Sequence, residues 1–128
     1  MRTGEFIYAL THAEFLNKVF GTNYKGYMKC TWRYDDNKTV WMVRFNEQNG
    51  GWTNKLLSPN RIVEENRDAG RLPTKNTTVR DIDKVKIVIE IMGQGYNRRY
   101  VFRGVFKYDE INSNSETIRY YDKIADEI

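Results

Sequence analysis

Two stretches of the chain, residues 25–44 and 84–107, combine cationic and aromatic residues at close spacing. Lysine and arginine side chains displace the counterions of a phosphate backbone, and exposed aromatic rings stack on unpaired bases. Alternating cations also protect sheet edges from aggregation, so an ordinary solvent-facing surface remains an alternative. The pattern predicts a nucleic-acid-binding surface that the two stretches share. Its expected members are Lys25, Lys29, Arg33, Arg44, Lys84, Lys86, Arg98, Arg99, Arg103 and Lys107.

Residues that could catalyse a reaction are few. His12 is the only histidine, and it lies near a predicted helix start, away from any nucleophile motif. Cys30 is the only cysteine, which excludes an intrachain disulfide and a cysteine-based zinc site within one chain. We therefore expect no catalytic residue, metal or cofactor. An enzyme acting on a small ligand stays open, because tyrosines and acids could converge without a local motif.

Two further patterns resemble reactive sites but have simpler explanations. The segment GQGYNR at 93–98 resembles a phosphate loop, but such a loop needs a following helix, and here a strand pattern follows. Asp81, Asp83 and Glu90 are spaced loosely like the acids of metal-dependent nucleases. Met92 stands where that motif would have its lysine. We interpret the glycines as a hairpin turn and the acids as solvated charges.

The elements that position the cations are predicted by alternation. Residues 84–92 alternate with a period of two, which is typical of a half-buried strand, and residues 98–109 form its hairpin partner. In the second strand, alternation places four aromatic residues on one face with Gly104: Tyr100, Phe102, Phe106 and Tyr108. A further strand is predicted in TIRYYDKI, residues 117–124.

The first half of the chain predicts a short strand at 5–10, a helix and another hairpin. Thr11 and Glu14 have the spacing of a capping box, and Gly21 is a suitable stop for the helix. Residues 25–34 and 40–46 read as two strands joined by the turn residues of 35–37.

The middle of the chain has a weaker pattern. Residues 47–52 are a loop by composition, and residues 74–78 read as a polar connection. Because the fixed φ of proline suits a first helical turn, a short helix is expected after Pro59, ending at Gly70. Its exposed side would carry Glu64, Glu65 and Asp68.

Length and composition favour one domain covering 1–128. The chain has 128 residues, 40% of them hydrophobic, and a formal net charge of +4. No segment approaches the roughly 20 apolar residues that cross a bilayer, and no signal peptide is recognisable. A cytoplasmic location is therefore expected. The order of elements predicts an α+β fold in which an antiparallel sheet closes into a small barrel with one or two short flanking helices.

The segments RYVFRGVFKYDE (99–110) and RYYDKIADE (119–127) resemble the terminal strands of PUA-like modules. This group contains SRA, EVE and ASCH domains, including those attached to restriction endonucleases. The resemblance implies a compact pseudo-barrel with a pocket that receives a modified base flipped from DNA or held in RNA. Such a pocket needs aromatic walls and polar groups for the base edge. From their chemistry we expect these to be Trp32, Trp41, Trp52 and Asn54.

The resulting hypothesis is a non-catalytic module that binds DNA or RNA and reads a modified or flipped base, in a restriction, defence or regulatory context. A protein partner would carry any catalytic activity, and no membrane is involved. The alternative is a protein-interaction module, such as a phage inhibitor or a complex subunit, that uses exposed aromatic side chains as anchors.

Overall fold

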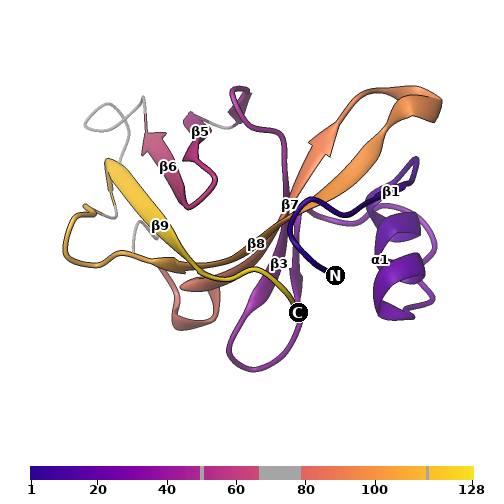
Figure 1. Ribbon diagram of the computed structural model, residues 1–128, viewed down its shortest axis with the longest axis horizontal. Coiled ribbons are helices and arrows are strands. Elements are labelled where there is room, and N and C mark those ends of the chain that lie inside the picture. Colours follow the sequence, from indigo (N-terminus) through magenta and orange to yellow (C-terminus); the bar gives the residue numbers. More distant parts are fainter. Residues whose placement is uncertain (50, 67–78, 115) are drawn as a thin grey trace.

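The structure is a computed structural model that describes residues 1–49, 51–66, 79–114 and 116–128. Its main element is a curved sheet of nine described strands with one described α-helix against it (Figure 1). The elements in chain order are β1 (Phe6–Tyr8), α1 (His12–Phe20), β2 (Thr31–Arg33), β3 (Thr39–Val43), β4 (Gln48–Asn49), β5 (Trp52–Ser58), β6 (Arg61–Asn66), the 3-10 turn η1 (Asp81–Asp83), β7 (Val85–Met92), the 3-10 turn η2 (Gly95–Asn97), β8 (Arg99–Tyr108) and β9 (Ile118–Ala125).

The sheet has the strand order β2-β3-β7-β8-β9-β6-β5-β4, and β1 pairs with β8. All of these pairs are antiparallel except β3 with β7, which is parallel. The expectation of a purely antiparallel sheet was therefore wrong at this pair. The chain leaves β3, forms β4 to β6 at the other end of the sheet, and returns so that β7 enters beside β3 in the same direction.

The described pairing does not close the sheet into a barrel, because β2 and β4 are the unpaired ends of the strand order. The sheet nevertheless bends, with β5 and β6 on one side of β3 and α1 on the other (Figure 1). The Trp41 ring of β3 lies 6.4 Å from the Tyr121 ring of β9. Residues far apart in the strand order therefore pack inside the curve.

Both faces of the central strands are buried. On one face, Phe15 and Leu16 of α1 pack against β3, β7 and β8, and the Phe15 ring stacks on Tyr100 at 4.7 Å. On the other face, Trp41, Ile62, Val88, Phe106 and Tyr121 form a second core inside the curve. This double burial explains why all five residues of β3 are buried.

The local predictions for α1 are confirmed. The Thr11 side chain accepts a hydrogen bond from the Glu14 N–H at 3.1 Å, and the Glu14 carboxylate accepts one from the Leu10 N–H at 2.8 Å. Gly21 ends the helix with a φ of 68°, in the left-handed region that glycine adopts without a Cβ penalty. The capping residues thus determine both ends of α1.

The predicted alternation of β8 was wrong beyond Phe102. Val88 pairs with Gly104, whereas Ile89 pairs with Phe102, so Arg103 is an extra residue in a β-bulge. The bulge reverses the faces, so Phe102 packs on the α1 side and Phe106 inside the curve. At Gly104, with φ +124°, an added Cβ would lie 2.9 Å from the carbonyl oxygen of Ala125.

The prediction of a helix after Pro59 was also wrong. Residues 61–66 form β6, which pairs with β5 on one side and β9 on the other, and Glu64 is buried. Pairing on both sides overrides any local helical preference. The predicted loop at 47–52 contains β4, which pairs antiparallel with β5. Asp68, Gly70 and residues 74–78 lie outside the described residues.

Candidate functional site

A cavity of about 300 Å³ lies where the end of β3 approaches β5. This volume is at the lower end of the range for small-ligand pockets and suits a single nucleobase. β3 and β5 are far apart in the strand order, and the bend of the sheet brings them close enough to enclose the cavity. The polar and aromatic side chains that line it are His12, Trp41, Arg44, Glu47, Asn54 and Arg98.

One backbone hydrogen bond positions the loop beside the cavity. The N–H of Asn46 donates to the carbonyl oxygen of Asn54 at 2.7 Å. Asn46 has a φ of 66°, a left-handed conformation that asparagine tolerates better than most residues. The turn at Asn46 therefore holds the start of the loop against β5 and brings Glu47 and Asn54 to the same cavity.

Asn54 is the most unusual polar residue of the site. Its side chain is 5% exposed, and its Oδ1 atom has no hydrogen-bond partner among the described residues. A buried acceptor without a partner destabilises a fold by about 1–3 kcal/mol. Asn54 lines the cavity, so a ligand that donates a hydrogen bond there would remove this cost.

Trp41 supplies the aromatic wall. It is 6% exposed, and the Lys86 ammonium lies 4.4 Å from its ring centroid. The same ammonium lies 4.9 Å from the Tyr121 ring, which places the cation between two rings. These contacts hold the Trp41 indole in one orientation while it lines the cavity.

His12, Tyr100 and Arg98 form a hydrogen-bonded group at another wall. Arg98 Nη2 donates to the Tyr100 hydroxyl at 2.7 Å, and the same hydroxyl lies 2.8 Å from His12 Nδ1. Burial, followed by the charges of Arg98 and Arg44, lowers the pKa of His12 below its ordinary value. Burial raises the pKa of Tyr100. Both rings are therefore neutral at pH 7, and the positive charge at this wall belongs to the arginines.

The structure brings Arg44 and Arg98 together from the two predicted cationic stretches, since both line the cavity. Arg103 forms an ion pair with Glu90 at 2.8 Å, and an Arg99 Nη2 atom lies 4.0 Å from Met92 Sδ, so both contact β7 inside the curve. Lys86 is 8% exposed and covered by rings.

The other predicted cations lie elsewhere. Arg33 and Lys107 lie at the opposite end of the sheet, where β2 pairs with the start of β3 and β8 pairs with the start of β7. Lys84 lies there too, held by Asp81 and Glu110. Exposed Lys25 and Lys29 belong to the segment between α1 and β2.

Of the four residues expected in the base pocket, Trp41 and Asn54 line the cavity. Trp32 lies on the α1 side, 5.2 Å from the Phe20 ring, and its Nε1 donates to the Tyr24 hydroxyl. Trp52 is covered by the Arg119 guanidinium, 4.1 Å from its ring centroid.

Sequence reasoning missed Glu47, and it placed His12 only near a helix start, with no part in a binding site. Glu47 stands in a loop whose composition carries no functional signal. His12 is half-buried because its neighbour in space is Tyr100, 88 residues away in the chain. No local pattern indicates that contact.

Some features are absent from the described part of the chain. Among these residues, no group of three or more histidine, cysteine or acidic side chains is placed to hold a metal ion. The described helix is too short and too polar to cross a bilayer.

Comparison with known proteins identifies both the fold and the family. The model of the SET and RING associated (SRA) domain matches residues 1–128. Among solved structures, the chain is similar to "The 5-Hydroxymethylcytosine-Specific Restriction Enzyme AbaSI", with 18% sequence identity and a TM-score of 0.73 over 98% of this chain and 40% of that one. No curated protein sequence matches the chain. The chain therefore belongs to the SRA family of DNA-binding domains, which read a modified cytosine flipped out of the duplex.

Proposed function

We propose that the cavity between β3 and β5 is the base pocket of this chain, and that its ligand is a 5-modified cytosine in DNA. The observation that carries this assignment is the unpartnered, buried Oδ1 of Asn54 in a cavity of nucleobase size. A buried acceptor is satisfied by a ligand donor, and the exocyclic amino group of cytosine is such a donor.

Glu47 and Asn54 together favour cytosine over thymine. Both line the cavity, and both offer oxygen acceptors to the two N–H bonds of the cytosine amino group. Thymine has a carbonyl oxygen at the same position, which would face these acceptors without a hydrogen bond. Trp41 would contact the face or edge of the ring, and its fixed orientation lowers the entropy cost of binding.

Arg44 and Arg98 would hold the phosphate backbone at this end of the sheet. Arg44 Nη2 donates to the Gly93 carbonyl oxygen at 2.8 Å, which anchors the side chain beside the β7–β8 turn. Guanidinium groups keep further donors free for phosphate oxygens. Of the remaining predicted cations, exposed Lys25 and Lys29 would extend the contact from the segment between α1 and β2.

A restriction or defence context is part of the proposal. The chain spans 40% of the length of the restriction enzyme whose structure it resembles. We propose that it supplies base recognition while a nuclease, in a partner protein or another part of a longer protein, cuts the DNA. The site of action would be the cytoplasm, where foreign DNA enters a cell.

Fluorescence anisotropy with matched duplexes tests the proposal. The duplexes carry cytosine, 5-methylcytosine, 5-hydroxymethylcytosine or thymine at one position, and RNA and single-stranded DNA of the same sequence complete the set. We expect tighter binding to at least one modified cytosine than to cytosine or thymine, and weaker binding at higher salt. Equal affinity for all four duplexes would remove the base-reading assignment, and tighter binding to RNA would replace DNA as the ligand.

The variant Glu47→Gln isolates the base-reading step. It keeps the size of the side chain but replaces one acceptor oxygen with a donor, so the preference for cytosine over thymine should fall. Glu65→Gln is the matched control, because Glu65 is exposed on β6 and does not line the cavity. Glu65→Gln should retain the wild-type preference.

A further inference from the structure

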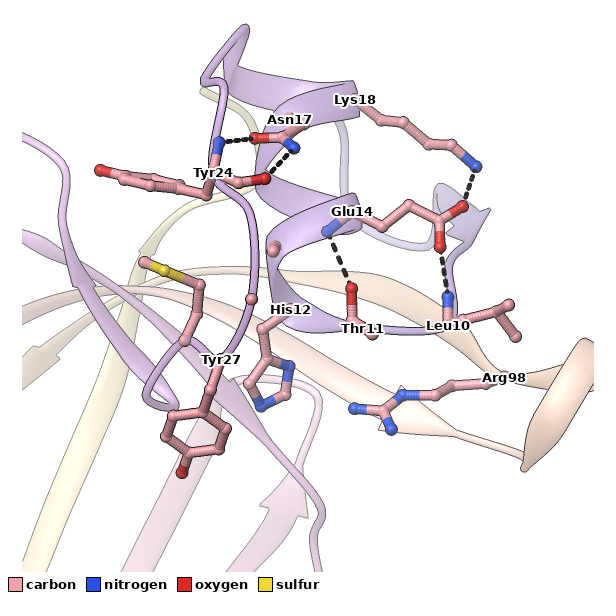
Figure 2. Close-up of a pocket in the computed structure, with 12 residues that line it drawn as sticks. Leu10, Thr11, His12, Glu14, Asn17, Lys18, Tyr24, Tyr27 and Arg98 are labelled. Atoms are coloured by element: carbon pink, nitrogen blue, oxygen red, sulfur yellow. Dashed lines mark hydrogen bonds and ion pairs between the residues drawn. The ribbon is translucent and has the colours of Figure 1, made fainter.

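A second, larger hollow lies beside the base pocket, under the start of α1. Its volume is about 720 Å³, and its walls are α1, Leu10, Arg98 and the segment that contains Tyr24 and Tyr27. Figure 2 shows His12 and Arg98 close together beneath the helix, with the Tyr27 ring on the other side of His12. His12 and Arg98 also line the base pocket, so the groove and the pocket share a wall.

The acceptor groups of the groove are already used within the protein. Glu14 Oε1 lies 2.9 Å from Lys18 Nζ, and Glu14 Oε2 accepts from the Leu10 N–H at 2.8 Å. The Asn17 side-chain oxygen accepts from the Tyr24 N–H and the Thr22 hydroxyl, while its Nδ2 donates to the Tyr24 carbonyl oxygen. Figure 2 shows the Glu14 and Asn17 contacts on the helix side of the groove.

The donor groups are in surplus. Arg98 always donates, so the Tyr100 oxygen accepts from it and the phenol proton is free to go to His12 Nδ1. With Nδ1 as the acceptor, the neutral imidazole carries its proton on Nε2, where it remains available to a ligand. The Nε atom of Arg98 is buried and has no partner among the described residues. A ligand that matches this wall must bring acceptors and negative charge.

We propose that the groove under α1 binds the backbone phosphate next to the base held in the neighbouring pocket, with Arg98 and His12 Nε2 as its donors. This inference rests on the proposed function, because it takes the occupant of the shared wall to be one nucleotide of the same strand. A nucleotide would place its base and its phosphodiester on the two sides of this pair of residues.

The remaining walls fit the sugar and the neighbouring nucleotide. Leu10, Tyr24, Tyr27 and Met28 line the groove with largely apolar surface. Tyr27 is 91% exposed, so its ring is accessible for stacking on deoxyribose or an adjacent base. The helix begins at His12, and the positive end of its dipole also favours an anion there.

Duplexes with one neutral linkage locate the phosphate. Each duplex carries the preferred modified cytosine and a single methylphosphonate, placed at successive linkages on either side of that base. For the wild-type chain we expect one linkage beside the modified base at which neutralisation weakens binding about tenfold, since charge-assisted hydrogen bonds are lost. Arg98→Gln should bind the unsubstituted duplex about tenfold more weakly and lose little more at that linkage.

Two further variants complete the test. Arg99→Gln is the matched control, because Arg99 is the next residue on β8 and does not line the groove; it should keep the wild-type sensitivity. His12→Gln leaves Arg98 in place and should reduce the sensitivity at the same linkage. Thermal unfolding confirms that each variant is folded, and if Arg98→Gln is not, His12→Gln carries the test.

Two results separate this inference from the function on which it rests. If wild type prefers modified cytosine but every neutral linkage weakens wild type and Arg98→Gln equally, the phosphate site is wrong and the base pocket stands. If wild type shows no preference among the bases, the proposed function itself fails, and the phosphate assignment fails with it.

Discussion

Replacing Asn54 by leucine should separate the folding role of this residue from its binding role. Leucine has nearly the same size and no polar atom. Since Asn54 Oδ1 is buried without a partner, its presence destabilises the wild-type fold by about 1–3 kcal/mol. Asn54→Leu should therefore leave the free energy of unfolding unchanged or raise it by an amount in this range, which is unusual for a change at a 5% exposed position.

The same substitution should weaken binding of the modified base. One hydrogen bond between neutral partners contributes about 0.5–1.5 kcal/mol. Its loss corresponds to roughly a 2- to 13-fold lower affinity for the duplex with modified cytosine. Affinity for a duplex with thymine at that position should change less, because thymine has no amino group for Asn54 and phosphate contacts dominate there.

Urea denaturation and fluorescence anisotropy on the same preparations measure both effects. Lys55→Ala is the control, since Lys55 is the next residue of β5, is exposed and does not line the cavity. A loss of more than about 1 kcal/mol in unfolding free energy together with an unchanged base preference would refute the reasoning. Asn54 would then be a structural residue with an unrecognised partner.

Three other predictions concern the fold and the charges around the site. In urea titrations, Gly104→Ala should lower the free energy of unfolding by about 1–3 kcal/mol more than Gly26→Ala does. Both glycines have a positive φ, but of the two only Gly104 lacks space for a Cβ. Equal losses would show that the backbone at the bulge shifts at little cost. The pKa of His12 is lowered on folding, so the unfolded chain binds more protons just below the ordinary value of 6.5, and stability should fall as pH drops through this value. His12→Gln should flatten that part of the stability profile, and a parallel profile would contradict the burial of this ring. Lys86→Met should leave the salt dependence of DNA binding unchanged, because the ammonium is covered by two rings. In a plot of log K against log salt concentration, a slope smaller in magnitude by about 0.9 would instead show that Lys86 contacts a phosphate.

Elements that depend on nearby residues could be predicted from the sequence. Thr11, Glu14 and Gly21 determine the ends of α1, because capping hydrogen bonds and a left-handed residue act over a few positions. The β7–β8 hairpin follows from alternation and the glycines of its turn. The resemblance of residues 99–127 to PUA-like strands was confirmed by the SRA family model.

Strands that depend on distant partners were harder to predict. β6 reads as a charged segment after a proline, and it is a strand because β5 and β9 lie on its two sides. The bulge at Arg103 was missed because strict alternation assumes that each residue has one cross-strand partner. The parallel pairing of β3 with β7 also arises from the path of the whole chain.

The sequence by itself determined the kind of chemistry this protein offers: cations and aromatic rings on β-strands, one histidine, one cysteine and no catalytic motif. Only the tertiary structure decided which of those residues meet. The curve of the sheet buries Trp41 and Asn54 at one cavity and leaves Trp32 on the other face, while Tyr100 joins His12 to Arg98. The type of each residue can be read directly from the sequence. A binding site, however, depends on contacts between strands that are distant in sequence, and these contacts form only when the whole sheet packs.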